Sequence, residues 1–332
     1  MIITRTPFRI SFFGGGTDYP AWYEENGGAV LSTTINKYCH IMCRYLPPFF
    51  DYNYLIRYST REEVKNVSEI VHPSVRECLR HLNVPKGVEI THTGDIPARS
   101  GIGSSSAFTI GLLHALYALS GKMVTKRQLA RDAIHVEQSL IQENVGSQDQ
   151  VATAFGGLNK IEFGGASEFY VSPVTIHEEK LDLLQSHLML FFTGFSRYAS
   201  DIAVEQIKQT HKHKTELTTM VEMVDEAIKI LDRDSDDLSD FGKLLNEAWG
   251  LKKRLNGLIS NSKIDEVYEV AMKSGALGGK LLGAGGGGFI LFFVPPEDRQ
   301  RIRNSLKDML YVPFGFEKLG TQVILYSTQD FY

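Results

Sequence analysis

The stretch PARSGIGSSSA, residues 97–107, contains residue types that bind phosphate, and the apolar run FTIGLLHALYAL follows it directly. This order predicts a loop that ends at the N-terminus of a buried helix. Unpaired backbone N–H groups and the positive end of the helix dipole favour an anion there. Glycines let the backbone close on a ligand, and serines cap the helix or donate from their hydroxyls. We therefore expect phosphate to bind at Gly101, Ile102, Gly103, Ser104, Ser105 and Ser106.

Two further glycine clusters lie far away in the sequence, in SFFGGGTDYP (11–20) and GGKLLGAGGGGFILFF (278–293). The second contains G-x-G-x-x-G from Gly283, but we expect a strand after it, where a dinucleotide-binding fingerprint requires a helix. GALGGKL is similar to a P-loop, yet Ser274 replaces its first glycine and Leu281 its Ser or Thr. Tight turns would explain one cluster alone, whereas three clusters together favour a ligand site.

Glu137 falls on the apolar stripe of a helix that is predicted to start at a capping box of Thr125 and Gln128 and to run through Ile141. The other members of this stripe are Leu129, Ala130, Ala133, Ile134, Leu140 and Ile141. A buried carboxylate is costly unless it is paired or bound to metal. Mg²⁺ takes one or two carboxylates together with phosphate oxygens. An ion pair with a lysine or arginine is the alternative, and the spacing alone favours this ion pair.

Three other charged residues have ordinary structural explanations. Asp149 lies where a glycine-containing loop meets a short predicted helix, so it could be an N-cap. Asp18 follows glycines and suits a turn. Arg9 could be an arginine on the surface of a strand.

Taken together, the three clusters resemble the motifs of the galactokinase, homoserine kinase, mevalonate kinase and phosphomevalonate kinase family (GHMP kinases). PARSGIGSSSA resembles the phosphate-binding motif P-x-x-x-G-L-G-S-S-A-A, TPFRISFFGGGTDY the N-terminal substrate motif, and KLLGAGGGG the C-terminal glycine motif. The motifs occur in the family's order, so the resemblance covers essentially the whole chain. Within the family, GGGTD and FTGFSRYASDI (192–202) look most like the D-glycero-D-manno-heptose 7-phosphate kinases.

The resemblance implies a kinase that uses ATP and Mg²⁺. Ser105 matches the family serine whose hydroxyl reaches magnesium, and Glu137 matches the magnesium glutamate, because Asp149 is the twelfth residue after it. Asp149 is then the residue that accepts or orients the proton of the attacking hydroxyl. Arg9 matches a basic residue that would hold Asp149 ionised and steady the phosphoryl group. Asp18 matches an aspartate that binds sugar hydroxyls.

One departure from the family pattern bears on the substrate. Galactokinase-like members carry Glu-His before Thr-Asp, where this chain has Gly15 and Gly16. The change opens room and removes a carboxylate, which suits a larger, anionic sugar. Arg197 is our candidate to bind its phosphate, and a solvated arginine at a helix start is the alternative. The complete expected substrate-binding set is Gly15, Gly16, Thr17, Asp18, Arg197, Gly285 and Gly286.

Composition limits the partners and the location of the protein. The 332 residues carry a formal charge of −4, which argues against a general nucleic-acid surface. Three cysteines in so long a chain favour a reduced, cytoplasmic protein. Cys39, His40 and Cys43 lie in a predicted strand with no second ligand pair, so we do not expect metal there. The N-terminus lacks the apolar core of a signal peptide, and no run approaches the ~20 apolar residues of a membrane span.

The pattern of elements predicts an α+β protein with the two-domain GHMP kinase fold: a ribosomal S5 domain 2-like N-terminal domain, residues 1–185, and a ferredoxin-like C-terminal domain, residues 186–332. We expect strands within 1–46 joined by a glycine loop, and strands at 88–96, 158–163, 168–174, 187–194, 289–294 and 322–327. We expect helices at 108–119, 125–141, 265–273 and 297–310, with a long, proline-free helical region over 199–259.

These observations lead to one main hypothesis and two alternatives. The protein is expected to transfer the γ-phosphate of ATP to the anomeric hydroxyl of a heptose 7-phosphate, which gives the 1,7-bisphosphate. One alternative is a kinase of another sugar, such as fucose or galactose. The other is a catalytically silent sensor of sugar or nucleotide, although a sensor has no need of Asp149, Glu137 and Ser105 together. The sequence leaves open the sugar, its anomer and the oligomeric state, a homodimer included.

Overall fold

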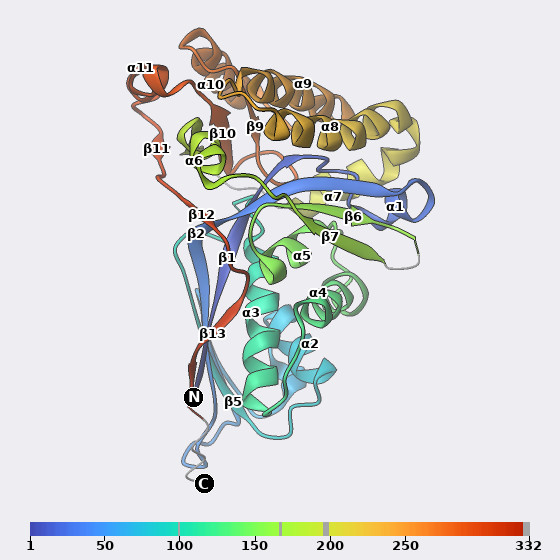
Figure 1. Ribbon diagram of the computed structural model, residues 1–332. Coiled ribbons are helices and arrows are strands. Elements are labelled where there is room, and N and C mark those ends of the chain that lie inside the picture. Colours follow the sequence, from blue (N-terminus) through green and yellow to red (C-terminus); the bar gives the residue numbers. More distant parts are fainter. Residues whose placement is uncertain (99, 166–167, 195–198, 328–332) are drawn as a thin grey trace.

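Two β-sheets organise the molecule (Figure 1), and the computed structural model describes residues 1–98, 100–165, 168–194 and 199–327. The larger sheet has the order β13-β1-β2-β5-β3-β4, while β6 and β12 also pair with β2, and β7 pairs with β6. Its strands are β1 (Ile2–Phe13), β2 (Gly28–Tyr45), β3 (Tyr54–Arg57), β4 (Arg61–Val64), β5 (Val88–Gly94), β6 (Asn159–Phe163), β7 (Phe169–Pro173), β12 (Phe316–Glu317) and β13 (Gln322–Tyr326). The smaller sheet has the order β11-β8-β10-β9. Its strands are β8 (Leu188–Phe192), β9 (Gly278–Leu281), β10 (Phe289–Phe293) and β11 (Leu310–Tyr311).

The helix after the serine-rich loop is the centre of the lower half in Figure 1. This helix, α3 (Ser104–Leu119), packs on β1 and β2 on one side and on three helices on the other. Those helices are α2 (Pro73–His81), α4 (Lys126–Ile134) and α5 (Gln148–Phe155). Because α3 is covered on both sides, it is apolar nearly all round, as the sequence predicts. Thr125 accepts a hydrogen bond from the Gln128 N–H at the start of α4, and a π-helical turn (His135–Leu140) continues that helix.

The second half of the chain adds further helices, most of them at the top of Figure 1. They are α6 (Glu178–Ser186), α7 (Ala199–Gln209), α8 (Lys214–Asp232), α9 (Ser239–Leu255), α10 (Ser262–Lys273) and α11 (Arg299–Ser305). Helix α9 packs on β9 of the smaller sheet, and α8 packs on α9 and on β1 and β2 of the larger one. The remaining helical elements are α1 (Pro20–Asn26) and three single 3₁₀ turns at Val67–Glu69, Thr210–Lys212 and Pro296–Asp298. Across the described residues, no helix has the length and apolar character needed to cross a membrane.

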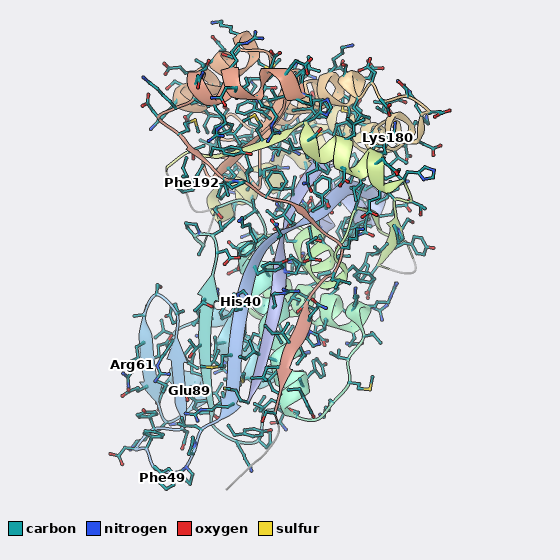
Figure 2. All side chains as sticks on the ribbon, turned by 60° about the vertical axis from the view of Figure 1, so that its left-hand side comes forward. His40, Phe49, Arg61, Glu89, Lys180 and Phe192 are labelled. Atoms are coloured by element: carbon teal, nitrogen blue, oxygen red, sulfur yellow. The ribbon has the colours of Figure 1, made fainter. Side chains whose placement is uncertain are left out.

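The chain returns to the larger sheet at its end, where β13 pairs antiparallel with β1 and Ile2 lies opposite Tyr326. The first and last described residues therefore lie side by side, and the Ser327 backbone N–H donates to the Met1 carbonyl at 2.8 Å. Figure 2 shows His40 in the larger sheet and Phe192 in the smaller one, with Phe49 at the far tip of the molecule.

The α+β fold class is confirmed, and the predicted strands at 88–96, 289–294 and 322–327 are present. The predicted helical region over 199–259 is also present, as the three helices α7, α8 and α9. The helix expected over 297–310 needs correction, because it ends at Ser305, before β11. The predicted glycine loop after β1 also contains α1, which starts at Pro20. The division between residues 185 and 186 falls near the end of α6 and stays a prediction.

Candidate active site

All three glycine clusters meet at one cavity of about 310 Å³. The predicted site residues that line it are Arg9, Gly15, Gly16, Asp18, Gly101, Gly103, Ser104, Ser105, Ser106 and Asp149. Five predicted site residues are not among those that line it: Thr17, Ile102, Glu137, Gly285 and Gly286. Arg197 lies outside the residues that the structure describes. The clusters converge because of the fold: β1 ends at this point, α3 begins there, and the turn after β9 lies beside them.

The serine-rich loop has the geometry of an anion site. Gly103 is the N-cap of α3 with φ of 75°, a left-handed conformation that glycine adopts without strain. The loop packs tightly on the third glycine cluster, since a Cβ on Gly101 would lie 2.5 Å from the Leu282 carbonyl oxygen. Ile102 is fully buried, and its carbonyl accepts a hydrogen bond of 3.1 Å from the Arg9 backbone N–H. Ile102 thereby ties the loop to β1, while the first N–H groups of α3 have no partner within the helix.

Arg9 and Asp149 form a two-pronged ion pair beside this loop. Arg9 donates from Nε to Asp149 Oδ1 at 2.6 Å and from Nη2 to Oδ2 at 2.9 Å. Its remaining arm donates from Nη1 to the Gly101 carbonyl at 2.9 Å. Asp149 lies in the first turn of α5, and Ser147 rather than Asp149 is the N-cap residue. The pair thus holds the Asp149 carboxylate in one orientation next to the predicted phosphate site.

Asp18 is the second carboxylate of the cavity, and it is buried. Its oxygens accept backbone N–H groups from Gly16 at 2.9 Å and Gln148 at 3.4 Å. Burial is the main reason that the pKa of the Asp18 carboxyl is raised. Thr17 beside it has a different position, because its hydroxyl is within hydrogen-bond distance of the Gly14 and Ala29 carbonyls at 2.8 and 3.0 Å. Thr17 therefore holds the turn, and Asp18 faces the cavity.

Glu137 is fully buried behind the loop, where Ser106 Oγ donates to its Oε2 at 2.9 Å and Gln150 Nε2 donates to the same oxygen at 2.5 Å. Burial raises the pKa of the Glu137 carboxyl to about 7. Its Oε1 has no hydrogen-bond partner in the described part of the chain, and no lysine or arginine there forms an ion pair with it. Ser105, in contrast, is exposed on the first turn of α3.

The unpartnered oxygen of Glu137 suits a cation. No group of three or more His, Cys, Asp or Glu side chains that suits a metal occurs among the described residues. A cation held here would therefore need hydroxyl and phosphate oxygens besides the one carboxylate, which is the way that Mg²⁺ binds with nucleotides.

Sequence reasoning missed two buried lysines that line the cavity. Lys252 on α9 is 5% exposed and donates from Nζ to the Gly283 carbonyl. Lys280 on β9 is 4% exposed and donates from Nζ to the Phe12 carbonyl at 2.9 Å. Burial lowers the pKa of Lys252 to about 8 and that of Lys280 well below its usual range. The position of Lys280 directly before the glycine motif LLGAGGGG could have indicated that it lies at the site. Lys252 belongs to the charged run LKKRL, which is typical of a solvated helix surface.

Comparison with known proteins identifies the family. Residues 69–157 match the model of the GHMP kinases N terminal domain, and residues 227–312 match that of the GHMP kinases C terminal domain. The chain is 30% identical to the D-glycero-alpha-D-manno-heptose 7-phosphate kinase of Campylobacter jejuni, and the alignment covers 97% of this chain and 98% of the relative.

Solved structures share the fold along the whole chain. A D-glycero-D-manno-heptose 1-phosphate kinase from Bacteroides thetaiotaomicron superposes with a TM-score of 0.78 at 24% identity, over 98% of this chain and 100% of the other. A galactokinase from Lactococcus lactis superposes with a TM-score of 0.74 at 19% identity, over 97% and 95% of the two chains.

Proposed function

The chain belongs to the GHMP kinase family and is an ATP-dependent sugar kinase, and we propose that its acceptor is D-glycero-D-manno-heptose 7-phosphate. The product would be the 1,7-bisphosphate, formed at the anomeric hydroxyl. The observation that carries this proposal is the Arg9–Asp149 pair held against the phosphate loop, in a chain that aligns end to end with a heptose 7-phosphate kinase.

The geometry supports a direct transfer between ATP and the sugar. The loop from Gly101 to Ser106 would hold the phosphates through backbone N–H groups. Asp149 would orient the attacking hydroxyl and accept its proton as the new O–P bond forms and the bond to ADP breaks. Arg9 would hold the Asp149 carboxylate in place through its two hydrogen bonds, and Asp18 would accept hydrogen bonds from sugar hydroxyls.

Mg²⁺ belongs to the same proposal, with Ser105 and Glu137 as the ligands that the family resemblance implies. When bound, the ion supplies positive charge that neutralises the phosphates. The contact of Ser106 with Glu137 adds a hydroxyl that orients the carboxylate, and the free Oε1 of Glu137 is the atom that fits the ion. The residues present therefore suit magnesium.

The choice of substrate rests on Gly15 and Gly16, which line the cavity without side chains. A Cβ on Gly15 would have no atom nearer than 3.8 Å, whereas one on Gly16 would lie 2.8 Å from Gln206 Nε2, so the room is at Gly15. Arg197 remains our predicted contact for the acceptor's own phosphate, and Gly285 and Gly286 remain predicted substrate contacts from the family motif.

The three cysteines are buried and free. A cytoplasmic location and a homodimer remain predictions as well.

A coupled ADP-release assay tests this function. We expect kcat/KM to be highest for the heptose 7-phosphate and much lower for heptose, fucose and galactose, which carry no phosphate. Arg197→Ala should raise KM for the sugar phosphate and leave KM for ATP near that of the unchanged protein. A neutral sugar as the best substrate would contradict the proposed acceptor, and no turnover on any sugar or sugar phosphate would favour the sensor.

A further inference from the structure

Lys252 lines the cavity but comes from outside the three glycine clusters. In the described part of the chain, its ammonium has a carbonyl as its hydrogen-bond partner and no carboxylate partner. Lys252 lies on α9, which packs on β9 and thereby brings the side chain into the cavity. Arg9, in contrast, is already neutralised by Asp149. A buried ammonium whose protein contact is one carbonyl costs stability.

The position of the ammonium is defined by its hydrogen bond to the Gly283 carbonyl. Gly283 packs on the phosphate loop, since a Cβ on Gly283 would lie 2.5 Å from Gly101 Cα. The charges that act on Lys252 are those of Arg9, Asp18 and Asp149, with Lys280 also nearby. Lys252 therefore lies beside the loop, within electrostatic reach of the carboxylate that faces the acceptor.

We propose that Lys252 is a further catalytic residue whose ammonium binds the phosphoryl group that passes from ATP to the sugar. An ammonium has three N–H donors, and the Gly283 carbonyl takes one of them. The donors that remain suit phosphate oxygens, whose negative charge would balance the buried cation. The inference rests on the phosphoryl transfer in the proposed function, but not on the identity of the acceptor.

Calorimetry with ATP and with ADP tests this without any acceptor. Lys252→Met should weaken ATP binding by about tenfold or more, the scale of one hydrogen bond to a charged group, and leave ADP binding within about twofold. Lys252→Arg should retain part of the preference for ATP. Lys253→Met is the matched control, because Lys253 is the next residue on α9, is 38% exposed and pairs with Asp265 away from the cavity. It should change neither affinity.

Turnover and thermal unfolding complete the test. Lys252→Met should lower kcat by about a hundredfold, change KM for the acceptor by less than about threefold, and leave the melting temperature equal or higher. Three results would overturn the proposal: equal losses for ATP and ADP, an unchanged kcat with a raised acceptor KM, or a lower melting temperature that accounts for the loss of activity. The second result would assign Lys252 to the phosphate of the acceptor. If the wild type uses another sugar, the proposed acceptor fails while this inference stands on the ATP and ADP affinities.

Discussion

Breaking the Arg9–Asp149 pair should cost both catalysis and stability, and a double-mutant cycle can separate the two. Arg9 is 3% exposed and Asp149 24%, so the guanidinium is the more deeply buried partner. Removing one partner of a buried pair costs about 3–5 kcal/mol because the other charge is left uncompensated. Asp149→Asn keeps one oxygen that can accept from Arg9. We therefore expect a loss near the lower end, about 3 kcal/mol of unfolding free energy.

The catalytic loss should be separate from this cost. Asp149→Asn should lower kcat by about a hundredfold or more under conditions where the protein is folded, the scale for a positioned acid–base group. Adding Arg9→Met removes the orphaned cation, so the double variant should be less destabilised than the sum of the singles by about 2 kcal/mol or more. Its kcat should stay low, because catalytic groups that act as a unit are not additive.

Urea unfolding and ADP release on the same preparations measure both quantities. The control cycle is the Arg233–Asp240 pair, whose side chains are 48% and 52% exposed, and its coupling should be below about 1 kcal/mol. If the buried pair couples no more strongly than this surface pair, the role of Arg9 in holding Asp149 is wrong. If Asp149→Asn is fully active, the catalytic assignment of Asp149 is wrong.

Three further results are expected. Lys252→Met should be more stable than the wild type at pH 7 by up to about 3 kcal/mol of unfolding free energy. The reason is that burial lowers the pKa of Lys252 to about 8, so that below pH 8 the folded wild type carries the full cost of the buried charge. In urea unfolding, the stability difference should shrink as the pH rises from 8 toward 10.5, and a difference that grows would contradict this reasoning. Ser105→Ala should lower magnesium-dependent kcat more than it lowers the melting temperature, because Ser105 is a proposed magnesium ligand, and Ser106→Ala should lower it as well, since the Ser106 hydroxyl bonds Glu137; an unchanged kcat in Ser105→Ala would contradict its place in the metal site. Gly103→Ala should weaken ATP binding measured by calorimetry, because a Cβ there would lie 3.1 Å from Arg9 Cγ at a left-handed φ of 75°; unchanged affinity would contradict the need for glycine.

Elements with strong local signals were predictable from the sequence. The loop before α3 combines glycines, serines and an apolar run, and each of these acts within a few residues of its own position. The region 199–259 was predicted to be helical because its charged, helix-periodic pattern contains no proline. That pattern did not locate the breaks, which the structure places at Thr210–Lys212 and between Asp232 and Ser239. Helix α1 had a local signal, Pro20 at its first position, but the preceding glycines favoured a loop.

The candidate site was predictable only where residues lie in recognisable motifs. Arg9 and Asp149 are far apart in sequence, and family resemblance rather than spacing brought them together. Lys252 had no such motif, and a lysine in a charged helix is normally solvated. Its burial results from the packing of α9 on β9, which the helical pattern alone does not specify. Which serine contacts Glu137 could be seen only in the structure. Ser105 and Ser106 are adjacent in sequence, but Ser105 is exposed on α3, whereas Ser106 is buried and donates to Glu137.

Two charged groups at the cavity, Lys252 and Glu137, are costly to bury in the empty protein, and ligand binding would explain why the protein contains them. Asp149 is neutralised by Arg9 and Asp18 accepts backbone N–H groups, so both carboxylates are satisfied before any ligand arrives. Lys252 has only a carbonyl partner among the described residues, and the unpartnered oxygen of Glu137 is complementary to it in charge. A nucleotide phosphate with its cation would satisfy both at once, because the anion meets the ammonium and the cation meets the carboxylate. Removing the Lys252 ammonium should then stabilise the empty protein and weaken its complex with ATP, which is the opposite of what loss of an ordinary structural contact would do. Removing the Glu137 carboxylate should also weaken the complex, but it would leave the Ser106 hydroxyl and the Gln150 amide without their acceptor.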